Sequence, residues 1–295
     1  MWKFGSNEIM MFFLGIGGVV FLLSQILQIP ISDMGLNLIF ILIFVIIIVI
    51  HAWETLGSRE MLVFFLIAFC LPLLYEYTDG LGFGGLLGCT FSYSNLLGPK
   101  FLGKIPYVIP IVWAISLYGT FTMTNIIFNR IRITHKFEEV ASLQWFFKIV
   151  GMGIVTGLIM ASLDLIIDPV MVAMGAWSWL VGGPYYGIPL WNYEGWIEIS
   201  AETFVCYSVY LLIVKKSQIY IGGEKKSRYT LLVVVLYLAS LFIYAMYAVD
   251  AQMTYVIPWA AMTTGFFASI AVIQFYRSSL GGEKQDSSSM KKRRT

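Results

Sequence analysis

The chain has 295 residues, of which 59% are hydrophobic and only 12% are charged. Soluble globular domains carry about 25% charged residues, so this composition, with a mean hydropathy of +0.80, excludes a soluble enzyme, a nucleic-acid-binding protein and a disordered scaffold. The three cysteines (Cys70, Cys89 and Cys206) are scattered and form neither a disulfide framework nor a metal-binding pattern. We therefore expect a membrane protein.

Eight segments are long and apolar enough to cross a membrane as helices, which takes about 20 residues. In chain order they cover residues 8–28, 36–53, 60–77, 106–129, 146–167, 194–214, 229–249 and 255–276. The first follows Lys3 as a signal peptide would, but no small-residue cleavage site comes after it. With no internal repeat in view, the sequence predicts an all-α fold: a polytopic membrane bundle of about eight helices, forming one domain over residues 1–280.

The loops between these spans divide the basic residues unevenly. With eight spans, all but two of the 19 Lys and Arg residues lie on the side of the two termini, and the exceptions are Lys100 and Lys104. Because Lys and Arg accumulate in cytoplasmic loops, both termini are predicted to be cytoplasmic. Residues 281–295 are rich in Ser, Lys and Arg, and we expect them to form a disordered basic tail that touches anionic lipid.

Two outer loops are longer than a connection requires. Residues 78–105 are rich in Gly, and residues 168–193 in Trp, Tyr, Gly and Pro. Such backbone is tolerated at membrane depth only against protein or a water-filled cavity, so we expect tightly folded or re-entrant loops. The Gly-rich run 79–88 lacks the strand and the Lys-Ser/Thr pair of a phosphate-binding loop, and we interpret it as close-packed backbone.

The placement of the carboxylates is the most informative feature. An ionisable side chain inside a span costs about 3 kcal/mol or more and is a functional candidate by default. In the predicted outer half of the bundle the acids are Glu76, Asp79, Asp164, Asp168, Glu194, Glu198, Glu202 and Asp250. For any single acid, a structural role remains open, in which it only hydrogen-bonds a neighbour and holds two helices together.

Helical spacing groups two of these acids. Asp164 and Asp168 are four residues apart and therefore share one helix face. The glycines at positions 153 and 157 continue this face inward as a GxxxG pair, which permits close packing of helices. The face that carries the two aspartates is thus expected to pack against protein rather than lipid.

The remaining polar candidates are interpreted as structural or secondary. His51 and Glu54 form an HxxE pair at the inner end of a span, but di-metal bundles need several such pairs and the chain has only two histidines. We therefore expect no metal site, and we expect His51 to cap or crosslink helix ends. We also expect structural or secondary roles for Glu194 and Glu202, which form a stripe with Glu198, and for Trp177 in an outer loop. The same holds for a stripe of tyrosines on one helix face, formed by Tyr237, Tyr244 and Tyr247.

Three strings resemble a known family: YSNLLGPKFLGKIPYVIPIVW (residues 93–113), LDLIIDPVMVAMGAWSW (163–179) and YYGIPLWNYEGW (185–196). They are similar to segments of the membrane carotenoid biosynthesis family that contains the CruF-type carotenoid 1,2-hydratases, including bisanhydrobacterioruberin hydratase. HAWETLG (51–57) and Glu76 also fall where that family carries polar residues. The resemblance covers about residues 50–200.

The resemblance implies a cofactor-independent hydro-lyase. Such an enzyme adds water to the terminal C=C of an acyclic carotenoid end group, of bisanhydrobacterioruberin, lycopene or gamma-carotene type, and yields a tertiary alcohol. The implied partners are a carotenoid or other long isoprenoid, membrane lipid and other membrane enzymes of the carotenoid pathway, without nucleic acid. The implied location is the cell membrane of an archaeon or bacterium.

The residue roles follow from the chemistry and the positions. Hydration of an unactivated alkene begins with protonation by a strong acid held beside an apolar pocket, which paired carboxylates can supply. The resulting tertiary cation is stabilised by carboxylates and aromatic faces. We assign the acid–base chemistry to Asp164 or Asp168 together with Glu76. Partners of the water or the cation are expected among Glu198, Asn192, Tyr93, Asp79, Tyr185 and Tyr186.

Three alternatives stay open. A membrane lycopene-type cyclase uses the same protonation and differs only in that an alkene captures the cation. A UbiA-like prenyltransferase needs two Asp-rich motifs to hold magnesium and diphosphate, whereas this chain has the single pair Asp164 and Asp168. From another class, a proton-coupled transporter would explain the acidic stripe at positions 194–202, but such proteins usually show inverted repeats.

Overall fold

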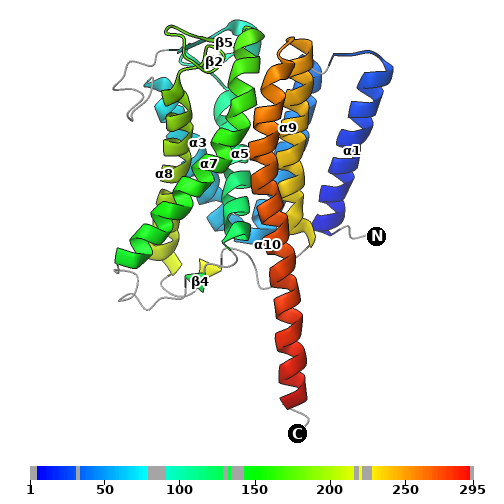
Figure 1. Cartoon of the computed structure of the whole chain (residues 1–295), viewed down its shortest axis with the longest axis vertical. Helices are drawn as coiled ribbons and strands as arrows, with labels where there is room; N and C mark the ends of the chain where they lie inside the picture. The colour runs from blue at the N-terminus through cyan, green and yellow to red at the C-terminus, as the bar shows by residue number, and fades with distance from the viewer. Residues whose placement is uncertain are drawn as a thin grey trace.

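The computed structural model describes residues 5–30, 34–78, 91–128, 132–133, 143–215, 219–220 and 228–292. Its long helices stand side by side as a bundle (Figure 1). They are α1 (Ser6–Ile26), α2 (Met34–Leu56), α3 (Ser58–Tyr77), α5 (Val108–Ile127), α7 (Leu143–Ala173), α8 (Leu190–Lys215), α9 (Leu232–Asp250) and α10 (Ile257–Lys292). In the described ranges, eight helices are long and apolar enough to cross a membrane, which confirms the predicted all-α membrane bundle.

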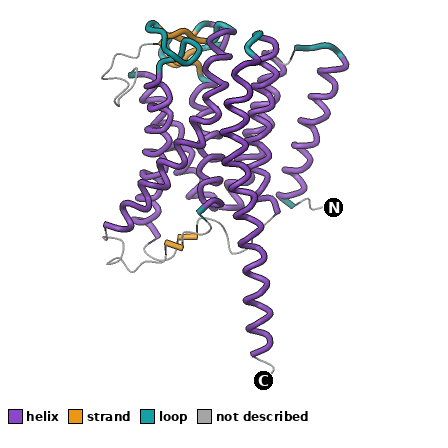
Figure 2. The backbone as a smooth tube through the Cα atoms, in the orientation of Figure 1, coloured by secondary structure: helices purple, strands orange, loops and turns teal. Residues whose placement is uncertain are grey.

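Short strands lie at the two ends of the bundle (Figure 2). The antiparallel pairs are β1 (Phe91–Tyr93) with β5 (Trp177–Trp179), β2 (Lys100–Phe101) with β3 (Ile105–Pro106), and β4 (Arg132–Ile133) with β6 (Ile219–Tyr220). Single 3-10 turns occur at η1 (Asn95–Leu97), η2 (Arg228–Leu231) and η3 (Thr254–Val256). The pair β1–β5 joins the two long outer loops, which are far apart in the sequence.

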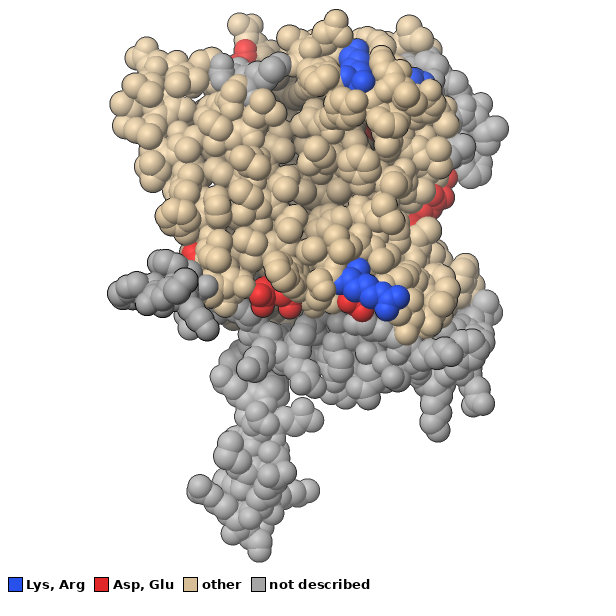
Figure 3. Space-filling model, turned by 180° about the vertical axis from the view of Figure 1, so that it is seen from behind, with Lys and Arg blue, Asp and Glu red and all other residues tan. Residues whose placement is uncertain are grey.

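The two ends of the bundle differ in what they carry. α1 begins and α10 ends at the same end, and β2 and β5 lie at the opposite end (Figure 1). Following the predicted topology, we call the first the inner end and the second the outer end. Between the ends, the face in Figure 3 consists mostly of uncharged side chains, as a surface in contact with lipid requires.

Several helices extend beyond the predicted spans. α7 continues to Ala173 and includes Pro169, and α8 begins at Leu190. α10 runs to Lys292 and projects beyond the bundle (Figure 1). The predicted spans stop where polar residues begin, because they are defined by apolar composition. A helix continues through polar residues, because backbone hydrogen bonds hold it together.

The tightest helix contact is between α7 and α8. A Cβ added to Gly157 would lie 2.6 Å from the backbone oxygen of Ile197, and one added to Gly153 would lie 3.0 Å from that of Ala201. Real Cβ atoms do not approach backbone as closely as 2.6 Å, so only glycine allows this approach at position 157. The predicted packing of the GxxxG face against protein is confirmed, and it brings the aspartates of α7 next to the start of α8.

Candidate active site

Two buried aspartates near the outer end of α7 share one amide. Asp164 is 0% exposed and Asp168 is 3% exposed. Nδ2 of Asn192, in the first turn of α8, donates to Oδ2 of Asp164 at 2.7 Å and also to Oδ2 of Asp168. Nε1 of Trp177, in β5, donates to Oδ1 of Asp168 at 2.8 Å. The i, i+4 spacing on α7 and the close α7–α8 contact together allow one amide to reach both carboxyl groups.

Glu76, near the outer end of α3, joins these aspartates. Its Oε2 accepts from the hydroxyl of Tyr93 at 2.8 Å, and its Oε1 accepts from Nε1 of Trp113 at 2.9 Å. Its carboxyl group lies close enough to Asp164 and Asp168 to interact electrostatically with both. We call Asp164, Asp168 and Glu76 the acid cluster, and it combines residues from two helices.

The short sheet β1–β5 holds two members of the acid cluster at once. Tyr93 and Trp177 are directly opposite in the register, so their side chains share a face, and their ring centroids are 5.7 Å apart. One cross-strand pair therefore presents a hydroxyl to Glu76 and an indole N–H to Asp168. Burial, together with the charge of Glu76, raises the pKa of the Tyr93 hydroxyl well above its usual value, so Tyr93 remains a donor.

Among the described residues, one carboxyl oxygen of the acid cluster, on Asp164, accepts no hydrogen bond. Both carboxyl oxygens of Asp168 and of Glu76 accept hydrogen bonds. Oδ1 of Asp164 is buried and has no hydrogen-bond partner among the described residues. Leaving a buried acceptor unsatisfied costs about 1–3 kcal/mol, and buried polar atoms without a partner are uncommon in native proteins. Oδ1 of Asp164 is thus the position where a small polar molecule or a substrate can bind.

Tyrosines surround the acid cluster on the side of α8 and α9. Tyr193 of α8 and Tyr244 of α9 both lie close enough to interact electrostatically with the two aspartates. The ring of Tyr185 lies 5.6 Å from that of Tyr193 and 4.7 Å from that of Tyr186, which in turn lies 4.9 Å from that of Tyr255. Burial raises the pKa of Tyr185 to about 12. Such a surrounding suits an apolar substrate and a cation that contacts aromatic faces.

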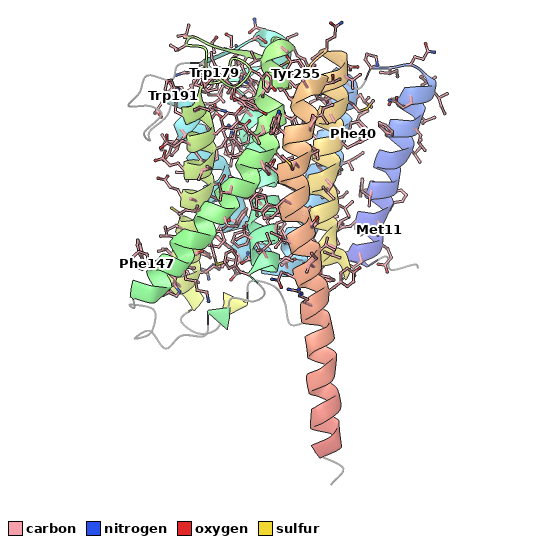
Figure 4. All side chains as sticks on the ribbon, viewed as in Figure 1. Met11, Phe40, Phe147, Trp179, Trp191 and Tyr255 are labelled. Carbon is pink, nitrogen blue, oxygen red and sulfur yellow. The ribbon has the colours of Figure 1, made fainter. Side chains whose placement is uncertain are left out.

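The structure brings together most of the predicted site residues. Those in or directly bonded to the acid cluster are Asp164, Asp168, Glu76, Asn192, Tyr93 and Trp177. Tyr185 and Tyr186 lie at its edge through their ring contacts. Asp79 lies outside the described residues. Aromatic side chains crowd this end of the bundle, as Trp179, Trp191 and Tyr255 show in Figure 4.

The acidic stripe of α8 faces a different partner. The hydroxyl of Tyr75, on α3, donates to Oε2 of Glu202 at 2.8 Å, and Tyr75 also lies within electrostatic reach of Glu198. Glu194, at the top of the stripe, is exposed. The lower part of the stripe therefore helps to join α8 to α3.

His51 and Glu54 lie at the inner end, away from the acid cluster. Nδ1 of His51 is 2.8 Å from the hydroxyl of Tyr118, which crosslinks α2 to α5. Glu54 accepts a hydrogen bond of 2.5 Å from Oγ of Ser6, which joins α1 to α2. Across the parts of the chain that the structure describes, no group of three or more His, Cys, Asp and Glu residues could hold a metal ion.

Several site residues have no distinguishing pattern in the sequence. Trp113 donates to Glu76 and its ring lies 4.3 Å from that of Trp196, but each looks like an ordinary aromatic residue near a membrane interface. Tyr193 and Tyr244 likewise resemble core tyrosines. The sequence offers one signal for them: a buried indole N–H or phenol needs a hydrogen-bond partner. This signal does not identify the partner.

Comparison with known proteins gives one match. No curated protein and no solved structure matches the chain. Residues 36–269, which include the eight predicted site residues that lie in or beside the acid cluster, match the family described as carotenoid biosynthesis protein. The chain therefore belongs to the carotenoid biosynthesis protein family.

Proposed function

We propose that this protein hydrates the terminal C=C of an acyclic carotenoid end group. The observation that carries the proposal is the open Oδ1 of Asp164, a fully buried carboxyl oxygen without a partner among the described residues. It lies in a cluster of three acids surrounded by aromatic side chains, in a member of the carotenoid biosynthesis protein family. A dry acid next to an apolar chain is what protonation of an unactivated alkene needs.

The hydrogen bonds indicate which acid carries the proton. Asp168 accepts from both Trp177 and Asn192, and these donors stabilise a negative charge on it. Asp164 accepts only from Asn192 among the described residues, and only at Oδ2. We therefore assign the proton to Oδ1 of Asp164, whereas Asp168 and Glu76 remain carboxylates.

The reaction then proceeds in two steps. The π electrons of the terminal C=C take the proton from Asp164, so a C–H bond forms on the less substituted carbon and a tertiary cation on the other. The carboxylates of Asp168 and Glu76, and the aromatic faces around them, stabilise this cation. Water forms the C–O bond and gives its proton to the carboxylate of Asp164, which restores the starting acid and leaves a tertiary alcohol.

The test is expression of the chain in a strain that accumulates an acyclic carotenoid, followed by mass analysis of the pigment. Wild type is expected to add one or two waters, and Asp164→Asn is expected to lower hydration by about 10²–10⁴-fold, the usual contribution of a general acid. The matched control is Glu202→Gln, which changes an acid of α8 that is bonded to Tyr75 and is expected to retain hydration.

Other products would contradict the proposal. An isomeric ring product would identify a cyclase, which shares the protonation step. A pigment lengthened by an isoprene unit would identify a prenyltransferase. Proton-dependent transport by vesicles that carry the protein, without any change in the pigment, would identify a transporter.

A further inference from the structure

Two buried oxygen atoms near the acid cluster have no hydrogen-bond partner among the described residues. One is Oδ1 of Asp164, and the other is the hydroxyl oxygen of Tyr193. Tyr193 follows Asn192 in the first turn of α8, and Asn192 donates to Asp164. Two unsatisfied groups so close to one carboxyl pair are unusual, since most buried polar side-chain atoms find a partner.

Several contacts place Tyr193 beside Asp164. The hydroxyl of Tyr193 lies close enough to Asp164 and Asp168 to interact electrostatically with both. The ring of Tyr185 lies 5.6 Å from that of Tyr193, and its hydroxyl donates to the backbone oxygen of Leu165, the residue after Asp164, at 3.0 Å. Tyr185 thus holds Tyr193 against this turn of α7.

The two unsatisfied atoms are complementary. A phenol donates a hydrogen bond, and a carboxylate accepts one. A single water between them would accept from Tyr193 throughout, would also accept from Asp164 while Oδ1 carries its proton, and would donate to Oδ1 once the proton has left. A buried water needs about two to four polar partners. We propose that Tyr193 is a catalytic residue that binds the attacking water between its hydroxyl and Oδ1 of Asp164.

This inference rests on the proposed hydration and adds the binding site of the second substrate, water. Before the reaction, Oδ1 of Asp164 carries the proton that passes to the alkene. After that transfer the same oxygen accepts a hydrogen bond from the water, whose lone pair is then free to attack the cation. The water loses one proton to Asp164 and one O–H remains in the alcohol, so that atoms and charges balance.

Tyr193 therefore controls whether the cation is captured by water or loses a proton. Without a bound water, the cation returns a proton from a neighbouring carbon to Asp164 and becomes an alkene again. In D2O this return leaves deuterium in carotenoid that has not been hydrated. The ratio of deuterated alkene to hydrated product measures water capture directly, and it does not depend on how much folded protein is present.

The experiment compares this ratio in membranes that carry wild type, Tyr193→Phe or Tyr210→Phe, incubated in D2O. Tyr193→Phe is expected to raise the ratio about tenfold, the effect of losing one hydrogen bond. The control, Tyr210→Phe, removes another hydroxyl of α8 that is buried without a partner among the described residues. It lies about 25 Å further along the helix and is expected to leave the ratio unchanged.

Each other outcome has a definite meaning. An unchanged ratio in Tyr193→Phe, or an equal change in Tyr210→Phe, overturns the water site while the proposed hydration stands. Loss of both deuteration and hydration in Tyr193→Phe also overturns it, because Tyr193 would then be needed before the cation forms. A wild type that neither deuterates nor hydrates the carotenoid overturns the proposed function itself.

Discussion

At the residue scale, hydrogen-bond partners distinguish carboxyl groups that are alike in the sequence. Asp168 and Glu76 each accept bonds at both oxygens, from an indole N–H and a second donor. Asp164 keeps one oxygen open among the described residues. In the proposed mechanism this difference separates the proton donor from two stabilised carboxylates, and it depends on Trp113, Trp177 and Asn192 more than on the acids themselves.

A substitution of Trp177 tests whether the donors around the carboxyl groups matter for the reaction. Trp177→Phe keeps an aromatic ring beside Tyr93 but removes the N–H that donates to Asp168. A hydrogen bond to a charged group is worth about 1.5–3 kcal/mol, so hydration is expected to fall at least about tenfold. The measurement is the initial rate of alcohol formation in isolated membranes, normalised to the amount of protein.

Trp179 in the same strand is the matched control. Its Nε1 is buried and has no hydrogen-bond partner among the described residues, so Trp179→Phe removes an N–H without removing a bond to an acid. Equal loss of rate in the two variants would show that the strand needs its indoles for packing and that the bond to Asp168 has no special role.

At the scale of elements, two features hold the acid cluster in place. The close contact of α7 with α8 brings Asn192 to both aspartates, and the three-residue pair β1–β5 brings Tyr93 and Trp177 to Glu76 and Asp168. The helix contact depends on glycine, because backbone oxygens of α8 lie where a side chain would start. We therefore expect stability and activity to be coupled at this contact.

Gly157→Ala is expected to disturb both properties. Its Cβ would lie 2.6 Å from the backbone oxygen of Ile197, so the helices must separate, at a cost of about 1–3 kcal/mol for overpacking. We expect a lower Tm in detergent and a lower hydration rate, since Asn192 moves away with α8.

The control for this change is Gly151→Ala on the same helix. A Cβ added to Gly151 meets no atom within 4 Å, so the variant is expected to keep the Tm and the rate of wild type. If Gly157→Ala behaves like Gly151→Ala, close approach of α7 and α8 is not what positions the site.

At the scale of the whole molecule, the bundle separates two polar ends. The acid cluster lies toward the outer end, whereas His51 crosslinks helices near the end where α1 begins and α10 ends (Figure 1). The distribution of Lys and Arg predicts that the latter end is cytoplasmic. The proposed chemistry would then take place in the half of the membrane that faces away from the cytoplasm.

Labelling of single cysteines tests this orientation. In a variant without the three native cysteines, Leu102→Cys lies in the outer turn between β2 and β3, where Leu102 is 71% exposed. Ser58→Cys lies at the start of α3, at the inner end, where Ser58 is exposed. A membrane-impermeant maleimide is expected to label the first in intact cells and the second only after the membrane is opened. The reverse pattern would refute the predicted orientation.

Composition and local periodicity are enough to predict the class of fold and part of the candidate site. Hydropathy marks each span because the cost of placing a side chain in lipid depends on composition alone. The pairing of Asp164 with Asp168, and the close packing of their helix face, follow from helical periodicity, which is local. The span boundaries shifted at α7, α8 and α10, where polar residues continue a helix.

Only the tertiary structure decided which distant residues meet. That Glu76 joins the aspartates, that Asn192 bridges them and that the stripe of α8 contacts Tyr75 depend on how each helix is rotated and tilted. Those angles arise from packing over the whole bundle, and a strand of three residues such as β1 carries too little periodicity to be recognised. Whether Oδ1 of Asp164 has a hydrogen-bond partner depends on where the donors of all the surrounding helices and strands lie.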